Sequence, residues 1–396
     1  MVTKKVAKKG LIGGMSFAKE AGAINWFPGH MAAATRAIRS RLKLSDLVIE
    51  VRDARIPLSS ANEDLQPQLS AKRRIIALNK KDLANPNVLN KWTHHFESKK
   101  QDCVAINAHS RSSVKKLLDL VEFKLKEVIA REPTLLVMVV GVPNVGKSAL
   151  INSVHQIAAT RFPVNVEMEC NMPYLDVCIM SVVQDRLKRA TVGPLPGVTQ
   201  DIAGFKIAHR PSVYVLDSPG VLVPNIPDIE TGLKLALSGS VKDSVVGEER
   251  LAQYFLAILN TRGTPLHWKY LFEGRNEGSA HPDSIDKPSY NLKDLRHQRS
   301  KQPDSSAVHY VGGMISEVQR SLYTTLSEFD GDTEDENDLE CLIEQQFEAL
   351  QKALKVSTRA SSEARLMVSK KFLTLFRTGR LGPFILDDVP ETDMSL

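Results

Sequence analysis

Cysteine is scarce in this sequence, which limits how the fold can be held together. The four cysteines are scattered at positions 103, 170, 178 and 341, with no CxxC pair and no neighbouring cluster of histidines. Disulfide scaffolds and structural zinc sites need cysteines at close, regular spacing. The sequence therefore argues against both and fits a reducing compartment.

Long apolar runs are also absent. A membrane-spanning helix needs about 20 consecutive apolar residues, and the longest apolar run, over residues 135–142, is far shorter and ends in a glycine-rich turn. A run of that length is typical of a buried strand. With 42% hydrophobic and 25% charged residues, the composition is that of an ordinary globular protein. The 396 residues suggest two or three domains.

Acidic residues are sparse in the N-terminal third, although the net charge of the whole chain is only +6. Such a basic region either neutralises nucleic-acid phosphates or serves as a solvated surface. No acid precedes Glu20, whereas lysines stand at Lys4, Lys5, Lys8, Lys9 and Lys19. The first 23 residues therefore resemble an organelle transit segment, with a disordered basic arm as the alternative.

The middle of the chain alternates between two kinds of segment. Short apolar stretches predict strands at 46–51, 74–78, 103–106, 135–140, 204–208 and 213–216, and helical spacing separates them at 87–99, 114–129 and 147–154. This alternation predicts an α/β fold with a doubly wound, mainly parallel sheet. After Asp228 only helical spacing recurs, at 229–240, 248–259, 314–326, 338–354 and 361–375. The polar residues 273–307 between these helices are typical of a flexible linker.

The first motif with a chemical role is GVPNVGKS at residues 141–148. It matches GxxxxGK[ST], follows a predicted strand and opens a predicted helix, which is the setting of a phosphate-binding P-loop. Lys147 is expected to contact the β- and γ-phosphates of a nucleotide, and Ser148 to ligate Mg²⁺. The nucleotide-binding residues predicted here are Pro143, Asn144, Val145, Gly146, Lys147 and Ser148.

A second motif, NKKD at residues 79–82, matches NKxD at the end of a predicted strand. The Asp82 carboxylate can accept two hydrogen bonds from N1 and N2 of guanine, and adenine offers no such pair of donors. Asn79 is expected to brace the base-binding loop and the Lys80 stem to lie against the base. Alone the tetrapeptide is a weak signal, but beside a P-loop it predicts preference for GTP.

A third motif, DSPG at residues 217–220, matches DxxG after the predicted strand at 213–216. Asp217 is expected to hold a Mg²⁺-bound water, and the Gly220 amide to bind the γ-phosphate and sense its loss. Thr199 stands between the P-loop and this motif, in PGVT at 196–199. It is the expected switch threonine, which would bind Mg²⁺ and the γ-phosphate.

The order of these motifs is unusual, because NKxD precedes the P-loop instead of following DxxG. Ligands of a doubly wound sheet bind at the carboxyl ends of its strands, so connectivity can be permuted without moving the site. This order, with WFPGHM at 26–31 and DAR at 53–55, resembles the YlqF/RbgA-type circularly permuted GTPases and their mitochondrial members most of all. The resemblance covers residues 24–265 and a closing segment, FRTGRLG, at 376–382.

The resemblance implies a Mg²⁺-dependent GTP hydrolase with an unusual catalytic arrangement. Val221 and Leu222 follow DxxG, where Ras-like enzymes keep a glutamine that orients the attacking water. The family's proposed substitute maps to His30, whose alternative role is packing of the N-terminal segment. Asn144 would support a K⁺ ion at the site. The catalytic residues expected on this basis are His30, Lys147, Thr199 and Gly220.

Two segments depart from the family's pattern. After the predicted strand at 103–106 the chain reads Asn107-Ala108-His109 in place of a Ser-Ala-Lys-like loop, so Asn107 and Ala108 are only weakly marked as base contacts. Between the P-loop helix and the switch threonine, the residues near 164–183 are additional to the short link that is usual in the family. They are either a genuine loop insertion or an extra exon or retained intron in the gene model.

The pattern along the chain predicts a basic arm (1–23), a permuted GTPase domain (24–225), a helical region (226–272), a flexible linker (273–307) and a helical C-terminal region (308–396). The resemblance implies binding to the large ribosomal subunit and its rRNA in the mitochondrial matrix, with plastid and nucleolus as alternatives. Hydrolysis of GTP to GDP would drive release. A GTP-controlled scaffold with negligible turnover stays open, as does peripheral association with the inner membrane without a transmembrane segment.

Overall fold

The computed structural model describes residues 11–16, 30–129, 131–161, 203–209, 212–223, 226, 228–273, 305–357 and 361–390. The chain divides into two compact units. The sheet unit takes Ser16–Leu251 and Phe376–Leu396, and the helical unit takes Met1–Met15 and Ala252–Leu375. This division differs from the sequence-based boundaries, which placed residues 226–272 and 308–396 outside the GTPase domain.

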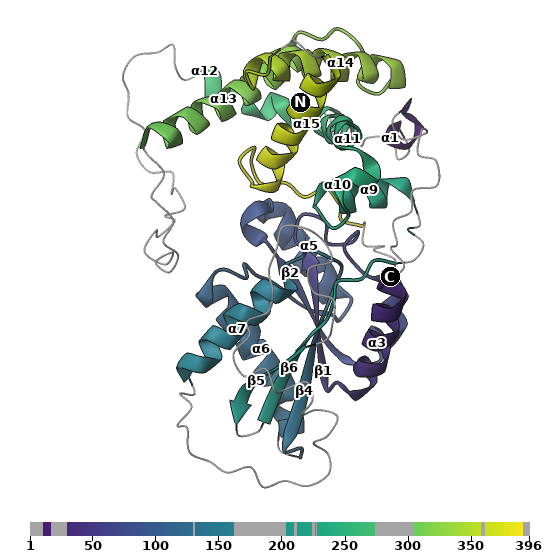
Figure 1. Cartoon of the computed structure of the whole chain (residues 1–396), viewed down its shortest axis with the longest axis vertical. Helices are drawn as coiled ribbons and strands as arrows, with labels where there is room; N and C mark the ends of the chain where they lie inside the picture. The colour runs from purple at the N-terminus through teal and green to yellow at the C-terminus, as the bar shows by residue number, and fades with distance from the viewer. Residues whose placement is uncertain are drawn as a thin grey trace. The chain divides into compact units, whose positions relative to one another are not determined.

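The sheet unit is built on six strands in the order β3-β2-β1-β4-β6-β5 (Figure 1). Their bounds are β1 Leu47–Asp53, β2 Arg73–Asn79, β3 Asp102–Ala105, β4 Thr134–Val140, β5 Ala203–His209 and β6 Ser212–Asp217. Every neighbouring pair is parallel except β5 and β6, which are antiparallel. The predicted strands are all present, and the doubly wound, mainly parallel sheet is confirmed.

Helices cover both faces of this sheet (Figure 1). On one face lie α3 (His30–Leu44), α4 (Gln66–Ser70) and α5 (Pro86–Ser98); on the other lie α6 (Arg111–Ile129) and α7 (Lys147–Arg161). β4 reads TLLVMVV and is apolar after its first residue because both of its faces are covered. Two apolar clusters form on the first face, one around α3 and β4 and one around α5 and β2.

Buried charges separate these two clusters. Glu50, in the middle of β1, is buried and accepts hydrogen bonds from Arg52 Nε at 2.9 Å, Gln66 Nε2 at 3.1 Å and Arg74 at 3.2 Å. The Arg52 guanidinium lies 5.4 Å from the centre of the Phe96 ring on α5. Because buried charges are tolerated only when they are paired and hydrogen-bonded, these residues depend on one another.

The sheet unit continues beyond the sheet through α9 (Ile229–Leu237) and α10 (Asp243–Val246). Both boundaries between the units fall inside helices, namely α11 (Glu248–Thr261) and α15 (Ser361–Arg377). The shorter elements are η1 (Glu63–Leu65) and η2 (Lys81–Leu83) in the sheet unit, and α1 (Leu11–Gly14), η3 (Pro265–Trp268) and α12 (Tyr270–Glu273) in the helical unit.

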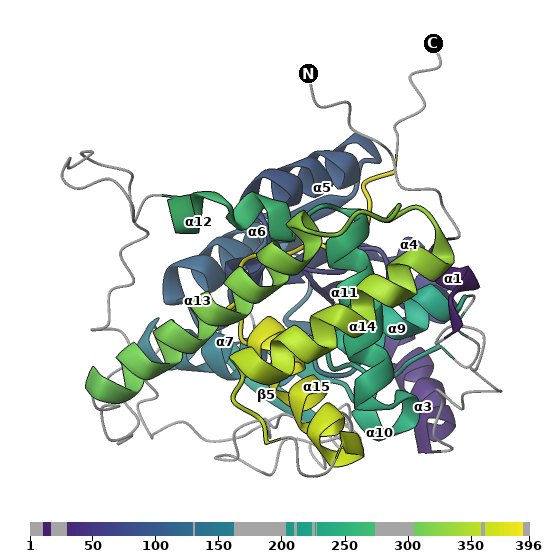
Figure 2. The ribbon, with the colours of Figure 1, turned by 90° about the horizontal axis from the view of Figure 1, so that it is seen from above.

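The helical unit contains α13 (Ser305–Ser327) and α14 (Glu336–Ala353), which pack along one another (Figure 2), and most of α15. The predicted C-terminal helices are thus confirmed. Asn260 and Gln346 exchange two buried side-chain hydrogen bonds of 2.8 Å, which fixes α11 against α14. Within the described ranges, no helix has the length and apolarity needed to cross a membrane.

Candidate functional site

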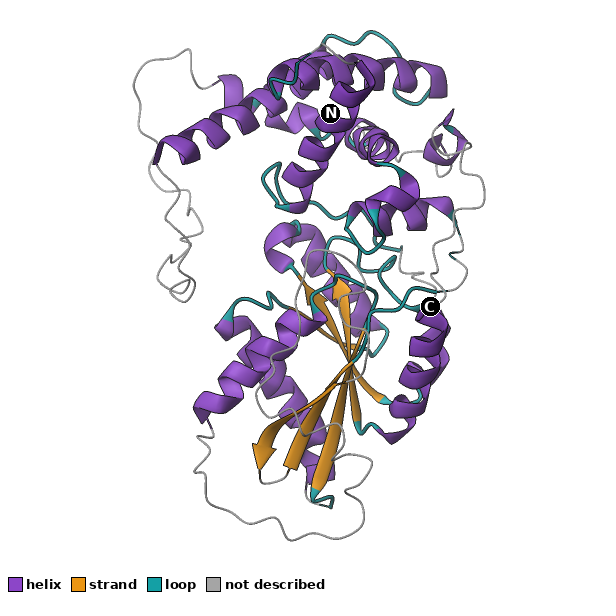
Figure 3. Ribbon diagram, viewed as in Figure 1, coloured by secondary structure: helices purple, strands orange, loops and turns teal. Residues whose placement is uncertain are grey.

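The candidate site lies at one edge of the sheet, where the parallel strands end (Figure 3). Asn79 ends β2, Asp53 ends β1, the P-loop follows β4, and Asp217 ends β6. These four strands are neighbours in the order β2-β1-β4-β6. The sheet therefore brings the three motifs together despite their permuted order, as expected for a ligand edge formed by strand ends.

The P-loop turns on residues with left-handed backbone conformation. Asn144 has φ 60° and Gly146 has φ 95°. A Cβ atom on Gly146 would collide with Asn79 Nδ2, so glycine is required there by close approach as well as by φ. α7 begins at Lys147, which directs its N-terminal amides toward the loop. The loop thus has the backbone geometry of an anion cradle.

Asn79 connects the loops of the site. Its Nδ2 donates to the Val145 carbonyl of the P-loop at 2.8 Å, and its Oδ1 accepts from the Ala108 amide at 2.9 Å. Ser153 Oγ of α7 donates to the Ala108 carbonyl at 2.5 Å. The loop after β3 is thereby fixed to both the NKxD strand and the P-loop helix.

Lys80, which is half-buried, joins the NKxD loop to the P-loop and pairs with the buried Asp53. Its backbone is left-handed at φ 63°, and its Nζ lies 2.8 Å from the Asn144 carbonyl oxygen and 2.9 Å from Asp53 Oδ2. Burial lowers the pKa of Lys80, and the Asp53 carboxylate opposes this effect. Burial would raise the pKa of Asp53, but Arg55 and Lys80 together hold that pKa well below its usual value.

Arg55 completes this arrangement. Its guanidinium bonds both Asp53 carboxylate oxygens, at 3.0 and 2.8 Å, donates to the Ser238 carbonyl at 3.3 Å and lies 5.1 Å from the centre of the Phe376 ring. Asp53 and Arg55 were not among the predicted site residues. The only signal for them in the sequence was the DAR triplet at the end of a predicted strand.

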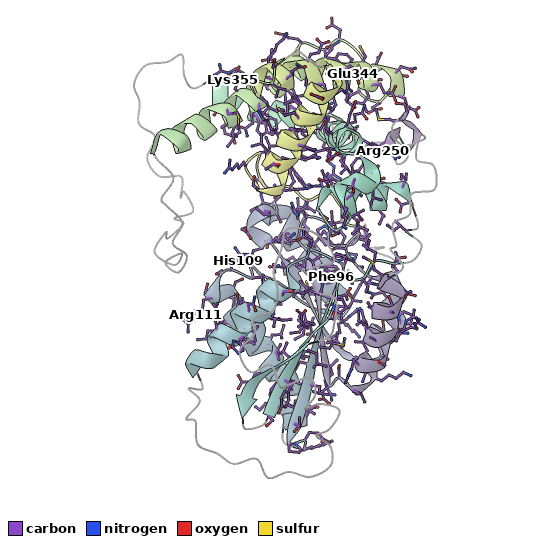
Figure 4. The ribbon with its side chains drawn as sticks, viewed as in Figure 1. Phe96, His109, Arg111, Arg250, Glu344 and Lys355 are labelled. Atoms are coloured by element: carbon purple, nitrogen blue, oxygen red, sulfur yellow. The ribbon has the colours of Figure 1, made fainter. Side chains whose placement is uncertain are left out.

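The NKxD motif leaves Asp82 at the surface. Asp82 is exposed in η2, whose Lys81 amide bonds the Ile106 carbonyl at 3.1 Å. Asn107 instead closes its own turn, since its Oδ1 accepts from the amide of His109 (labelled in Figure 4) at 2.8 Å. The structure therefore presents the Asp82 side chain outward and uses the Asn107 side chain for the local fold.

Lys147, Ser148 and Asp217 meet at the phosphate end of the site. Lys147 is buried and its Nζ donates to the Val142 carbonyl at 2.9 Å. Burial lowers the pKa of Lys147 to about 8 against the effect of Asp217. Burial raises the pKa of Asp217, although Lys147 and a bond from Ser148 oppose the shift.

The same residues fit a Mg²⁺ ion. Ser148 Oγ lies 3.1 Å from Asp217 Oδ2, while the buried Oδ1 of Asp217 has no hydrogen-bond partner among the described residues. A hydroxyl and a carboxylate with an unsatisfied oxygen are hard ligands of the kind that Mg²⁺ selects. At the K⁺ position suggested by the sequence, the Asn144 side-chain amide donates to the Gly239 carbonyl at 3.2 Å.

The DxxG glycine packs directly on the P-loop. A Cβ atom on Gly220 would lie 2.7 Å from Pro143 N and 2.9 Å from Lys147 Nζ, so no larger residue fits. Val221 and Leu222 are buried in the core, and the Val221 carbonyl accepts from Asn62 Nδ2 at 3.0 Å. The position that holds a glutamine in Ras-like enzymes is thus an internal apolar residue here.

Three sequence predictions cannot be placed in this site. Thr199 and residues 164–183 lie outside the described residues. The backbone of His30 begins α3, but its side chain also lies outside the described part. Among the described residues, no cluster of His, Cys, Asp or Glu could hold a further metal ion.

Comparisons with known proteins place the chain in a family, although no protein-family model matches it. It is 86% identical to Short integuments 2, mitochondrial, from Arabidopsis thaliana, across 99% of this chain and 96% of that protein. It is 40% identical to DAR GTPase 2, mitochondrial, from the same plant, across 92% of this chain and 90% of that protein. Ribosome biogenesis GTPase A of Bacillus pumilus is 34% identical across 60% and 75%.

The motif order and the sheet define a GTPase whose strands are circularly permuted. The chain belongs to the YlqF/RbgA-type circularly permuted GTPases, which confirms the resemblance seen in the sequence. The solved structure of GDP-bound YlqF aligns with 89% of this chain and 98% of its own, at 18% identity and a TM-score of 0.44. Family membership rests on the sequence similarity rather than on that alignment.

Proposed function

We propose that this GTPase assists assembly of the large ribosomal subunit in the mitochondrial matrix and that hydrolysis of GTP to GDP and phosphate drives its release. The observation that carries the proposal is the junction of NKxD, P-loop and DxxG at one sheet edge. Two relatives that match most of the chain are named mitochondrial, and a bacterial relative is named for ribosome biogenesis.

The proposed residue roles combine the sequence motifs with the geometry of the described part of the site. Asp82 recognises guanine, and Lys80 lies against the base. The amides at the start of α7 bind the phosphates, and Lys147 turns from the Val142 carbonyl to the β- and γ-phosphates. Ser148, Asp217 and Thr199 would hold Mg²⁺, which would neutralise charge on the phosphates. At the phosphate end, the assignments use Lys147 and Asp217, whose pKa values burial shifts away from the charged form.

Catalysis in this proposal uses His30 in place of the missing glutamine. Val221 is buried and its side chain has no polar atom with which to orient a water. The Gly220 amide binds the γ-phosphate, and His30, at the start of α3, orients the attacking water. Asn144 would help to hold a K⁺ ion, which would supply positive charge where other GTPases use an arginine. Turnover in K⁺ should then exceed turnover in Na⁺ at equal ionic strength.

Binding to rRNA is supported by the charge of α3. Its sequence, HMAAATRAIRSRLKL, contains no acidic residue, and Arg36 and Lys43 are exposed on it. Exposed Lys and Arg side chains neutralise phosphates and release counterions, so affinity for the subunit should fall as salt concentration rises. The peripheral membrane association considered for the chain has no comparable support among its described residues.

The proposal is tested by GTP turnover in K⁺ buffer with and without purified mitochondrial large subunits, with small subunits as the control. Stimulation by large subunits alone supports it. Tight GTP binding without stimulated turnover favours the alternative of a GTP-controlled scaffold. His30→Ala separates the two further, because it should abolish stimulated turnover in an enzyme without changing GTP affinity.

A further inference from the structure

A segment near the C-terminal end of the sheet unit lies beside η2, the turn that contains Asp82. In this segment, the C-terminal strap (residues 376–387), the Leu386 amide donates to the Arg55 carbonyl at 2.7 Å and the Phe384 amide donates to the Leu83 carbonyl at 3.1 Å. Arg55 belongs to the DAR loop (residues 53–62), and Leu83 ends η2, which contains Asp82. The strap thus bonds two loops of the nucleotide site through its backbone.

Asp387 fastens the strap to the DAR loop. Its Oδ2 accepts from the amides of Leu58 and Ser59 at 2.8 Å each, and its Oδ1 accepts from Ser59 Oγ at 2.6 Å. Lys234 of α9 lies 3.4 Å from the same Oδ1, and Asp387 is almost fully buried. A buried carboxylate that accepts from several donors and an ammonium group makes strong, directional contacts.

The other end of the strap is anchored near α9. Arg377 forms a bidentate pair with Asp243, at 2.7 and 2.6 Å, and also donates to the carbonyls of Leu237 and Ala236 at the end of α9 at 3.0 Å each. Between the two ends, Ile385 packs in the apolar cluster of α5 and β2. The strap is therefore a fixed part of the sheet unit rather than a loose tail.

The DAR loop passes this restraint to the nucleotide site. Asp53 pairs with Lys80 at 2.9 Å, and the Ala54 amide donates to the Asn79 carbonyl at 2.8 Å. At its other end, Asn62 Nδ2 bonds the Val221 carbonyl directly after DxxG at 3.0 Å. A loop held at both ends by the site and in its middle by Asp387 cannot shift without moving Lys80.

We propose that the C-terminal strap is a positioning element for guanine-nucleotide binding, with Asp387 as its main positioning residue. By holding the DAR loop, it keeps Asp53 and Lys80 aligned with the base, whereas the phosphates are bound by Lys147 and the amides at the start of α7. The inference rests on the nucleotide site proposed above. It predicts that loosening the strap weakens guanine-nucleotide affinity and leaves the rate of the chemical step unchanged.

The test compares Asp387→Asn with Asp388→Asn in the full-length protein. Both substitutions remove one negative charge, but Asp388 is exposed and lies just outside the strap. We expect Asp387→Asn to raise the Kd for fluorescent GDP and the KM for GTP about tenfold with unchanged kcat, since it weakens three charge-assisted hydrogen bonds. Asp388→Asn should match the wild type, and Ser59→Ala, which removes one of the three bonds, should raise both constants by a smaller factor.

Three outcomes overturn the inference. They are an unchanged Kd and KM in Asp387→Asn, a lower melting temperature without a change in Kd, and a fall in kcat at constant KM. If Asp387→Asn does not fold, Ser59→Ala decides alone, because an unchanged Kd for GDP there also contradicts the inference. Failure of the wild type to bind GDP would refute the nucleotide site itself and not the strap.

Discussion

Two lysines, the half-buried Lys80 and the buried Lys147, stand at opposite ends of the nucleotide site, and their ammonium groups have different partners. Lys80, at the base end, pairs with Asp53, whose pKa is held low by Arg55 and Lys80. Lys147, at the phosphate end, donates to a backbone carbonyl, and burial lowers its pKa to about 8. The nearby Asp217 has a raised pKa and one oxygen without a partner among the described residues.

This difference indicates that Lys80 mainly stabilises the fold, whereas Lys147 is available to bind a ligand. At the base end, Asp53 is paired with both Arg55 and Lys80, so the NKxD loop is organised by the fold, although burial also lowers the pKa of Lys80 and Arg55 Nη1 has no hydrogen-bond partner among the described residues. At the phosphate end, burial shifts both ionisable groups away from their charged forms, which is the usual mark of a functional site. A bound phosphate would raise the pKa of Lys147, and Mg²⁺ would lower the pKa of Asp217, so both would oppose the shifts that burial causes. Phosphate binding should therefore contribute strongly to affinity without destabilising the fold.

The largest expected effect comes from Lys147→Ala. The variant should lose at least about a thousandfold in GTP turnover, since a charge-stabilising contact to the transferred phosphoryl group disappears. Its melting temperature without nucleotide should stay at or above that of the wild type, because a buried and poorly paired ammonium is removed. Differential scanning fluorimetry and a phosphate-release assay measure the two quantities. A much lower melting temperature in the variant would show that Lys147 stabilises the fold, as Lys80 does.

Asp82→Asn should have the next largest effect. Asp82 is exposed and its proposed role is guanine recognition, so the variant should keep its melting temperature. Loss of two charged hydrogen bonds should weaken GDP binding by about a hundredfold. Because the new amide can donate to a carbonyl at position 2 of the base, binding of xanthosine diphosphate should improve. Titration with fluorescent GDP and XDP tests this, and unchanged base preference would remove Asp82 from the base site.

The pH dependence of GDP binding tests the lowered pKa of Lys147 at the phosphate end of the site. Phosphates favour the charged ammonium, so affinity for GDP should fall as pH rises through about 8, where Lys147 of the free protein loses its proton. Between pH 7 and pH 9 the expected loss is about tenfold. Lys147→Arg keeps its charge in this range, and its profile should be flat.

Stability should change in the opposite direction to affinity. The folded-state pKa of Lys147, about 8, lies below its ordinary value of 10.5, so the folded protein binds fewer protons than the unfolded chain between these values. The free energy of unfolding attributable to this group therefore rises with pH over that window. Denaturant titrations of wild type and Lys147→Arg between pH 8 and pH 10 measure the contribution, and identical pH profiles would contradict the pKa shift.

The sequence predicted the parts of the site that depend on local pattern. Gly146, Lys147 and Ser148 are marked by their spacing, and strand periodicity placed NKxD and DxxG at strand ends. Once the sheet is parallel, strand ends must meet at one edge, so the junction of the motifs also followed. The confirmed helices and strands reflect the same agreement between local pattern and fold.

Contacts over long sequence distance were not predictable. Asp387 bonds Leu58 and Ser59 far earlier in the chain, and an acidic residue near the C-terminus carries no local sign of such a partner. The Asp53–Lys80 pair depends on the register that sets Asp53 beside Asn79 in β1 and β2. Buried Glu50 likewise gives no signal in a sequence, because its burial depends on the partners that neighbouring elements supply.

The smallest expected effect concerns Lys80→Met, which keeps the apolar stem and removes the charge. Asp53 would retain Arg55 but lose one of its two cations, so the free energy of unfolding should fall by about 1–2 kcal/mol. The half-exposed neighbour Lys81→Met is the matched control and should be near neutral. Urea titration without nucleotide measures both. If Lys80→Met were as stable as the wild type, the base end would not be organised by its own ion pair, and the contrast with Lys147 would rest on the nucleotide alone.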